Sequence, residues 1–332
     1  MSTNANGVGQ PVSATVTDRA RGSQRAVVTA LVGNACIAAL KFTAGFVTGS
    51  SAMVSEGFHS CVDVGDQAML LLGQRRSRRP PDESHPFGYS RELYFWALIV
   101  AVTFFGIGGG LSVYEGVLHV LRPEPIVSPL WNYLTIAGAA VFESVSLAVG
   151  YREFRRQAGP ETTVWRAFRE GRDPSLYTVV VEDSTDLIGL GVAALAVLLS
   201  VELHAPRLDG LGSIVIGLVL GTAAVLLVRE SWGLIVGEGA SPQVTRDLQA
   251  IAQADPGVRR SYVPLTVYLG PERLVVAFRL EFEESLTAGD VALAAQRIER
   301  AVRERFPDVG EVTIEPARPA GADGAGDMPD GA

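Results

Sequence analysis

The sequence predicts an α-helical membrane protein, with six transmembrane helices followed by a small cytoplasmic α/β domain of order α-β-β-α-β. Only 19% of its 332 residues are charged, whereas a typical soluble chain carries about 25% charged residues. Six windows are predominantly apolar over the roughly 20 residues that a helix needs to cross a bilayer. From residue 237 onward, charged residues become frequent and the long apolar runs stop.

The six apolar windows are separated by polar connections, which argues against a bundle of buried helices in water. The second window is less apolar than the others. The third contains glycines that permit close helix contact, namely Gly106, Gly108, Gly109 and Gly110. In chain order the windows run from about Val27 to Val47, Ser51 to Leu72, Leu93 to Leu118, Trp131 to Val149, Leu176 to Val201 and Gly210 to Leu227, and the last can continue to Val236.

Arginine is distributed unevenly among the connections between these windows. The connections after the second and fourth windows are rich in arginine, as is the segment before the first window. The other three connections hold only Arg122 and Arg207. Because positively charged loops stay on the cytoplasmic side, this alternation predicts six spans with both termini in the cytoplasm.

The two ends of the chain have the composition of disordered segments. Residues 1–25 are polar and lack the apolar core of a cleavable signal peptide. Residues 317–332 are rich in proline, glycine, alanine and aspartate. Between these ends we expect a transmembrane domain at 26–236 and a cytoplasmic α/β domain at 237–316.

Within the second domain, the apolar residues change period along the chain. Residues 241–255 begin with a serine cap, continue at helical spacing and end before Pro-Gly. Residues 261–270 and 273–284 alternate apolar and polar side chains, as strands do. An amphipathic helix with a threonine cap follows at 287–306, and a last strand at 309–316. We expect helices to cover one face of the sheet.

Composition and motifs exclude several classes of protein. Acidic residues outnumber basic ones, 36 to 28, for a net charge of −8, which argues against a nucleic-acid binder. The only cysteines, Cys36 and Cys61, cannot form a disulfide scaffold or a cysteine zinc finger. The sequence contains no G-x-S-x-G, H-E-x-x-H or phosphate-loop motif. We therefore expect neither an enzyme nor an organic cofactor.

Ionisable residues inside the apolar windows are the candidate functional residues, because a charge at bilayer depth costs roughly 3 kcal/mol or more unless it is paired or hydrated. His59 and Asp63 lie four residues apart in the second window, and Glu182 and Asp186 lie four apart in the fifth. Residues at this spacing share one helix face. Two such pairs can enclose a tetrahedral divalent cation. Interhelical salt bridges are the alternative, and Asp183 is an alternative ligand to Glu182.

Other ionisable or thiol groups in the windows have a simpler interpretation. Lys41 can neutralise part of the acidic charge. Glu115 and Glu143 have no partner four residues away, so we interpret them as packing or hydration sites. Cys61 faces away from the His59 pair and is interpreted as a structural thiol. Histidines near the outer ends of the third and fifth windows, His119 and His204, are interpreted as interfacial residues.

The segments TGSSAMVSEGFHSCVD (48–63) and HPFGYSRELYFWALI (85–99) resemble the cation diffusion facilitator family of zinc transporters. The resemblance extends from the first window to Pro316. It implies a homodimer of six-span subunits in a membrane, here a bacterial inner membrane. It also implies a four-ligand transport site built from H/D-x-x-x-D in two spans, which in this chain corresponds to His59, Asp63, Glu182 and Asp186.

The chain departs from the family pattern at several positions. Glu182 stands where histidine or aspartate is usual, and a site with three carboxylates makes manganese, iron(II) or cobalt plausible beside zinc. The family's D-x-x-H-x-x-x-H loop motif reads Asp82, His85 and Tyr89, which implies a weak or absent second site. No histidine follows His204, so we expect the C-terminal domain to serve dimerisation rather than metal sensing.

The expected activity follows from the chemistry of the ligands. A divalent cation binds when the carboxylates are deprotonated and the imidazole is neutral. Loading therefore releases protons, and His59 is the main proton-coupled ligand because a free imidazole titrates near neutral pH. We expect efflux of a divalent cation, zinc first, by proton antiport and alternating access. The alternative is a membrane-embedded metal receptor or scaffold that transports nothing.

Overall fold

The structure is a computed structural model, and it describes residues 12–48, 51–123, 129–158, 163–171, 173–271 and 273–317. The chain divides between Val236 and Gly237 into two compact units, which are described separately below. The expected disordered tail, apart from Ala317, lies outside the described residues.

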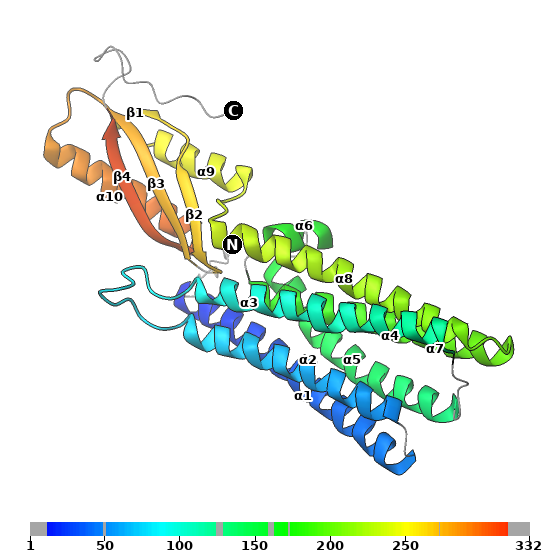
Figure 1. The fold of residues 1–332 in the computed structure, drawn as a ribbon. Coiled ribbons are helices and arrows are strands. Elements are labelled where there is room, and N and C mark those ends of the chain that lie inside the picture. The colour runs from blue at the N-terminus through cyan, green and yellow to red at the C-terminus, as the bar shows by residue number, and fades with distance from the viewer. Residues whose placement is uncertain are drawn as a thin grey trace, which may run out of the picture. The chain divides into compact units, whose positions relative to one another are not determined.

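The first unit is a bundle of long helices (Figure 1). A π-helical turn, η1, joins α3 to α4, so that these elements form one continuous helix, Glu92–Leu121. The elements are α1 (Val12–Thr48), α2 (Ser51–Arg76), α3 (Glu92–Thr103), η1 (Phe104–Gly109), α4 (Gly110–Leu121), α5 (Pro129–Ala158), α6 (Val164–Glu170), α7 (Pro174–Glu202) and α8 (Arg207–Val236).

The described residues include 5 helices that are long and apolar enough to cross a membrane: Asp18–Ala44, Glu92–Leu121, Leu130–Ala158, Pro174–Glu202 and Arg207–Val236. The second predicted span is α2, which has 26 residues. Its ionisable residues, including Asp63 and Asp66, lower its hydropathy. Together with the second unit, these helices confirm the predicted fold class.

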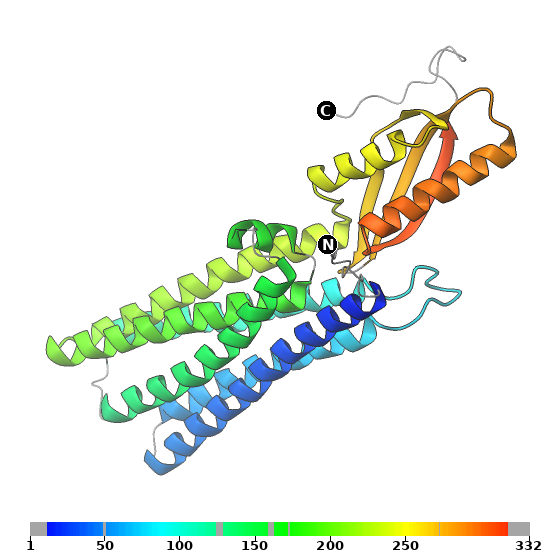
Figure 2. The same cartoon turned by 180° about the vertical axis from the view of Figure 1, so that it is seen from behind.

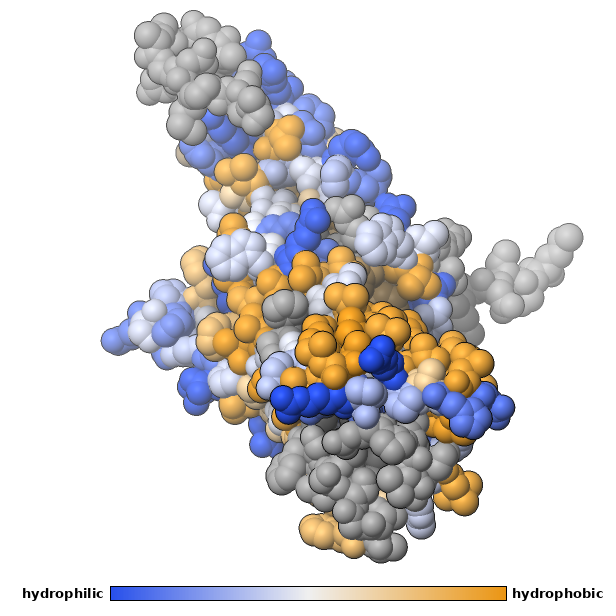
Figure 3. All heavy atoms as spheres, turned by 45° about the vertical axis from the view of Figure 1, so that its right-hand side comes forward, coloured by the Kyte–Doolittle hydropathy of each residue, from blue (hydrophilic) through white to orange (hydrophobic). Residues whose placement is uncertain are grey.

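The outer faces of the bundle are apolar. Large apolar side chains are exposed there, for example Val32 on α1, Val141 on α5 and Leu218 on α8, which are 53%, 62% and 61% exposed. Figure 3 shows apolar side chains dominating the helical part of one face. Soluble proteins rarely expose contiguous apolar surface of this kind, so the protein is an integral membrane protein.

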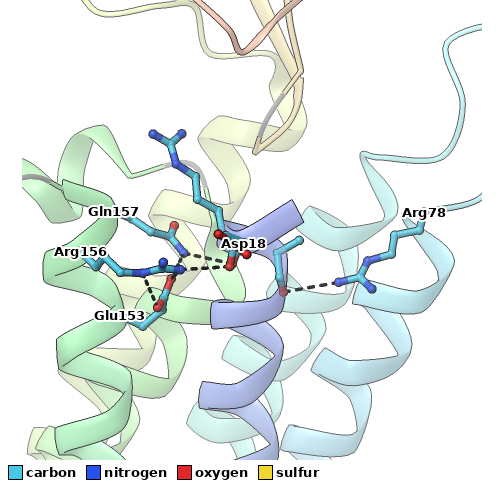
Figure 4. Close-up of polar contacts among 7 residues, drawn as sticks. Asp18, Arg78, Glu153, Arg156 and Gln157 are labelled. Carbon is cyan, nitrogen blue, oxygen red and sulfur yellow. Dashed lines mark hydrogen bonds and ion pairs between the residues drawn. The ribbon is translucent and has the colours of Figure 1, made fainter. Parts of the chain in front are cut away.

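The start of α1 corrects the expectation of disorder over residues 1–25. This helix begins at Val12, whereas residues 1–11 lie outside the described part of the chain. The polar segment has no apolar periodicity of its own, but side chains of α5 and of the turn after α2 donate hydrogen bonds to its backbone (Figure 4). Arg156 Nη2 donates to the carbonyl of Asp18 at 3.0 Å, Gln157 Nε2 to that of Arg19 at 3.4 Å and Arg78 Nη2 to that of Ala20 at 3.5 Å.

Glycines let the third and sixth spans approach closely. A Cβ atom added to Gly116 would lie 2.7 Å from the carbonyl oxygen of Gly210, and one added to Gly217 would lie 2.7 Å from that of Gly109. Gly109 and Gly116 are seven residues apart on one helix, and Gly210 and Gly217 are seven apart on the other, which is about two helical turns in each case. The two helices are antiparallel, so the two contacts lie about two turns apart along the interface. The prediction of close contact through the third window is confirmed at Gly109, and Gly116 extends the contact.

In its described residues, the second unit consists of a four-stranded sheet and two helices (Figure 2). Its central strand is β3, which pairs antiparallel with β1 and β2 and parallel with β4. The elements are α9 (Pro242–Gln253), β1 (Val258–Ser261), β2 (Leu265–Gly270), β3 (Arg273–Phe282), α10 (Ala288–Arg305) and β4 (Val309–Ala317).

The predicted strand at 261–270 is interrupted. Its ladder begins only at Leu265, where β2 starts, because Pro264 has no backbone N–H to donate to the neighbouring strand. The preceding strand, β1, lies at Val258–Ser261, mostly before the predicted range. The described order is therefore α-β-β-β-α-β, with one short strand more than predicted. Both predicted helix caps are present, since Ser241 accepts from the N–H of Val244 and Thr287 forms a capping box with Asp290.

Alternate residues of β3 form the core of this unit. Leu274, Val276, Phe278 and Leu280 are buried against the helices, from which Leu248 of α9 and Ile298 and Val302 of α10 contribute. Figure 2 shows both helices on the same face of the sheet, as the alternation of strand side chains predicts.

Candidate metal centre

Acidic residues of α2, α5 and α7 are buried inside the bundle. Asp66 of α2 and Glu182 and Asp183 of α7 are each 1% exposed, and Glu143 of α5 is 6% exposed. The helical spacing of Asp63 and Asp66 on α2 places them about one turn apart on neighbouring positions of one face. Glu182 and Asp186 on α7 are four residues apart, which also places them about one turn apart on one face.

One group of charges surrounds Asp186. This carboxylate interacts electrostatically with Glu143, Asp63, Asp183 and Lys41. Glu143 in turn interacts with Asp183, Asp63 and Lys41. The side chains of α1, α2, α5 and α7 therefore form one electrostatic cluster, in which Lys41 offsets part of the negative charge as expected.

A second group surrounds Glu182. Gln67 Nε2 donates a hydrogen bond to Glu182 Oε2 at 2.6 Å, which connects α2 to α7. Asp66 is the carboxylate with the strongest electrostatic interaction with Glu182. Glu182 also interacts electrostatically with Asp186 and Asp63. Three of the predicted ligands are therefore neighbours, and Glu182 is in addition hydrogen-bonded to Gln67.

His59 lies on α2, four residues before Asp63, but its side chain is outside the described part of the structure. Among the side chains that are described, no group of three or more histidine, cysteine, aspartate and glutamate residues is arranged to hold a metal ion. The four-ligand site therefore stays a prediction.

The sequence indicates only a packing or hydration role for Glu143, because no partner lies four residues away. The structure places it beside Asp63, Asp183 and Lys41. The position of an acidic residue in the middle of an apolar span was the feature of the sequence that could have indicated this role. Glu115, the other single acid, is exposed on α4.

The remaining candidates lie away from this cluster. His119 Nε2 lies 3.8 Å from Asp209 Oδ2, between α4 and α8. Cys61 is a free, exposed cysteine. His204 follows α7 with a φ of 51°.

The loop between α2 and α3 holds Asp82 and His85 in hydrogen bonds within the loop. Tyr89 donates its hydroxyl proton to Asp82 Oδ2 at 2.6 Å, while Ser84 Oγ and the backbone N–H of His85 donate to Asp82 Oδ1 at 2.7 Å each. These donors hold the pKa of Asp82 well below its usual range, the Tyr89 hydroxyl contributing most.

His85 is also engaged inside this loop. Its Nδ1 atom lies 2.8 Å from Ser84 Oγ, and its ring packs on that of Tyr89 with centroids 4.2 Å apart. Both side chains of the expected weak second site therefore have protein partners. A metal ion would have to replace these contacts.

Comparison with known proteins places the helical unit in a family. Residues 27–236 match the cation efflux transmembrane domain, a range that contains His59, Asp63, Glu182 and Asp186. The chain belongs to the cation diffusion facilitator family. The family assignment confirms the resemblance and agrees with the membrane-spanning helices.

Two similar proteins are named for zinc antiport and for metal tolerance. The mouse mitochondrial proton-coupled zinc antiporter SLC30A9 is 33% identical over 275 residues, which is 82% of this chain and 48% of the mouse protein. Metal tolerance protein C4 of Arabidopsis thaliana is 33% identical, over 75% of this chain and 55% of the plant protein. This chain thus spans about half the length of these relatives.

A bacterial relative has a length closer to that of this chain. The cation-efflux pump FieF of Cronobacter sakazakii is 27% identical over 292 residues, which is 87% of this chain and 91% of the pump. The similarity therefore includes the C-terminal unit as well as the family's transmembrane domain.

Proposed function

We propose that this protein exports divalent metal cations across a bacterial inner membrane in exchange for protons. Zinc is the first substrate, with manganese, iron(II) and cobalt beside it. The observation that carries this proposal is the buried cluster of acidic residues on α2, α5 and α7, inside a domain of the cation efflux family. The similarity of the chain to proteins named as a proton-coupled zinc antiporter and a cation-efflux pump supports this proposal.

The proposed ligands are His59 and Asp63 on α2 and Glu182 and Asp186 on α7. Several carboxylates buried near a single lysine need further positive charge, because an uncompensated charge inside the bilayer is costly. A divalent cation supplies this charge when it is bound, and protons supply it after the cation leaves. The carboxylates must lose their protons again before the next cation binds.

Alternating access provides the direction of transport. Protons bind where the cation is released and leave where it is taken up, so that the two fluxes are opposed. His59 is the proposed proton-coupled ligand, because an imidazole changes its charge between about pH 5 and pH 8. The active form is a homodimer whose termini lie in the cytoplasm.

Flux measurements in proteoliposomes test this function. Zinc uptake is followed with a trapped indicator while a pH gradient is imposed or collapsed. Wild type is expected to show zinc uptake that depends on the gradient, and the His59→Ala/Asp63→Ala protein is expected to lose it. Glu115→Gln, which changes an exposed acid on α4, is the matched control.

Normal transport of every divalent cation by the His59→Ala/Asp63→Ala protein would contradict the proposed site. Zinc binding by wild type without any flux would instead favour a membrane-embedded receptor or scaffold. A panel of zinc, manganese, iron(II) and cobalt in the same assay identifies the preferred substrate.

A further inference from the structure

Buried oxygen atoms without hydrogen-bond partners gather around Glu182. Among the described residues, Asp66 Oδ1 and Oδ2, Gln67 Oε1 and Glu182 Oε1 are all buried and accept no hydrogen bond. Asp66 and Glu182 are each 1% exposed, and Gln67 is fully buried. The 2.6 Å hydrogen bond from Gln67 to Glu182 brings the two helices together at this level.

This group lies at a different level of the bundle from Asp63 and Asp186. Asp66 follows Asp63 by three residues on α2, toward the end of that helix at Arg75 and Arg76. Glu182 precedes Asp186 by four residues on α7. Each displacement is about one helical turn, or roughly 5 Å, and on these antiparallel helices both lead toward the arginine-rich end.

We propose that Asp66, Gln67 and Glu182 form a second cation site, one turn from the Asp63–Asp186 level, for a hard divalent cation such as Mn²⁺ or Mg²⁺. The donors are carboxylate and amide oxygens, which these cations prefer. Neither imidazole nor thiolate is needed at this level. The site shares Glu182 with the proposed zinc site, but Asp66 and Gln67 belong to it alone, and it does not use His59.

The burial of the oxygens argues for a cation rather than for water alone. Buried polar atoms in native proteins have partners, and an unsatisfied group calls for an unseen water or ion. A water molecule can donate hydrogen bonds to Asp66 and Glu182, but it brings no positive charge. Two interacting carboxylates at this depth need such a charge, and a divalent cation provides both the contacts and the charge.

The position of the site indicates how it serves transport, a role that rests on the proposed function. A cation that enters from the arginine-rich end meets Asp66 and Glu182 before it reaches Asp63 and Asp186. The oxygen site is therefore a first binding position on the cytoplasmic approach. Binding at this position does not itself require that the protein transports anything.

Titration of the purified full-length protein with Mn²⁺, followed by electron paramagnetic resonance, tests the site. Wild type is expected to bind two Mn²⁺ ions per chain. Asp66→Asn, which keeps side-chain shape, is expected to weaken binding of one ion at least tenfold. Glu182→Gln, which changes the ligand that both sites share, is expected to weaken binding of both ions. Asp63→Asn is expected to lose the other ion, and Glu115→Gln to keep both.

Unchanged Mn²⁺ stoichiometry and affinity in Asp66→Asn would overturn the proposal. So would an infrared band of a protonated carboxyl group that persists in Mn²⁺-saturated wild type and disappears in Asp66→Asn, because a proton then replaces the cation. Thermal unfolding confirms that each variant folds. Two bound ions without flux in proteoliposomes would contradict the transport function while leaving this site intact.

Discussion

Gln67 on α2 donates a 2.6 Å hydrogen bond from Nε2 to Oε2 of Glu182 on α7. Both residues are almost fully buried, so the contact joins two helices that carry the candidate ligands. Gln67→Met removes this donor and leaves Glu182 Oε2 without it. We expect the free energy of unfolding in detergent to fall by about 1–3 kcal/mol, the usual cost of an unsatisfied buried group.

A double-mutant cycle separates this hydrogen bond from general packing. Glu182→Met and the double variant complete the cycle, since methionine keeps the length of both side chains. We expect the two substitutions to be non-additive by about 1 kcal/mol or more, because the second removes a group that the first left unpaired. Additive effects would show that the hydrogen bond contributes nothing.

This contact illustrates what the sequence could and could not predict. The apolar windows are set by the thickness of a bilayer, and each pair at i and i+4 lies within a single helix. Both could therefore be predicted from the sequence. The partnership of Gln67 with Glu182 joins positions 115 residues apart. It depends on how α2 and α7 pack, which no local pattern encodes.

Contacts between distant segments also explain why the sequence did not predict the position of Glu143 or the start of α1. Glu143 has no partner on its own helix, and its neighbours Lys41 and Asp63 come from other helices. The backbone of α1 at Asp18 and Ala20 accepts hydrogen bonds from Arg156 of α5 and from Arg78, which follows α2. By contrast, Pro264 was visible in the sequence, and its missing N–H was a sufficient reason to begin the predicted strand after it.

Glu143→Gln tests whether Glu143 belongs to the transport site. The residue is 6% exposed and interacts with Asp63, Asp183 and Lys41. Removal of its charge leaves fewer negative groups to attract a divalent cation, so we expect zinc flux in proteoliposomes to fall about tenfold, or roughly 1.4 kcal/mol. Glu115→Gln serves as the control, and equal flux in both variants would assign Glu143 to packing alone.

Gly116→Ala tests the close contact between α4 and α8. The added Cβ would lie 2.7 Å from the carbonyl oxygen of Gly210, so the helices must move apart. We expect a loss of about 1–3 kcal/mol in the free energy of unfolding, the usual cost of overpacking. Gly191→Ala on α7 is the matched control, because no atom lies within 4 Å of its added Cβ, and similar losses in both variants would contradict the packing argument.

Tyr89→His restores the family's loop motif beside Asp82 and His85. In wild type, Tyr89 donates to Asp82 at 2.6 Å, and we expect the loop to bind zinc weakly. Histidine removes this donor and supplies an imidazole ligand. Zinc affinity at the loop should rise about 100-fold, measured calorimetrically in an Asp63→Ala background that weakens the transport site.

The expected gain in zinc affinity requires ligands at all three loop positions, Asp82, His85 and the histidine introduced at position 89. Tyr89→Phe is the control, because it removes the hydroxyl donor without adding a ligand. It should not bind zinc more than a few-fold tighter than wild type. Equal zinc affinity in Tyr89→Phe and Tyr89→His would show that the tyrosine hydroxyl, and not the missing imidazole, limits this site.

Asp255 and Arg297 form a paired hydrogen bond in the C-terminal unit. Arg297 donates through Nε and Nη2 to the two carboxylate oxygens at 2.8 Å each, and the N–H of Gly257 donates to Oδ1 at 2.9 Å. These contacts, with Arg297 first, hold the pKa of Asp255 below its usual range. The charged carboxylate therefore stabilises the folded unit.

The sign of the pH effect follows from this lowered pKa. The unfolded chain, in which an aspartate titrates near pH 3.9, binds the proton before the folded chain does. The contribution of Asp255 is thus fully present above about pH 5 and declines as the pH falls through the folded pKa. Because the Arg297 side chain is 51% exposed, solvent screens the pair, and we expect Asp255→Asn to cost only about 1 kcal/mol at pH 7.

Thermal unfolding of the C-terminal unit in the full-length protein, followed by circular dichroism, measures this difference. The gap between wild type and Asp255→Asn should shrink between pH 5 and pH 2. Glu284→Gln is the control, because that carboxylate lies 3.4 Å from Arg259 with a side chain 78% exposed, and exposed pairs contribute little. A gap that stays constant with pH would mean that Asp255 acts through the geometry of its turn, with Gly257, rather than through its charge.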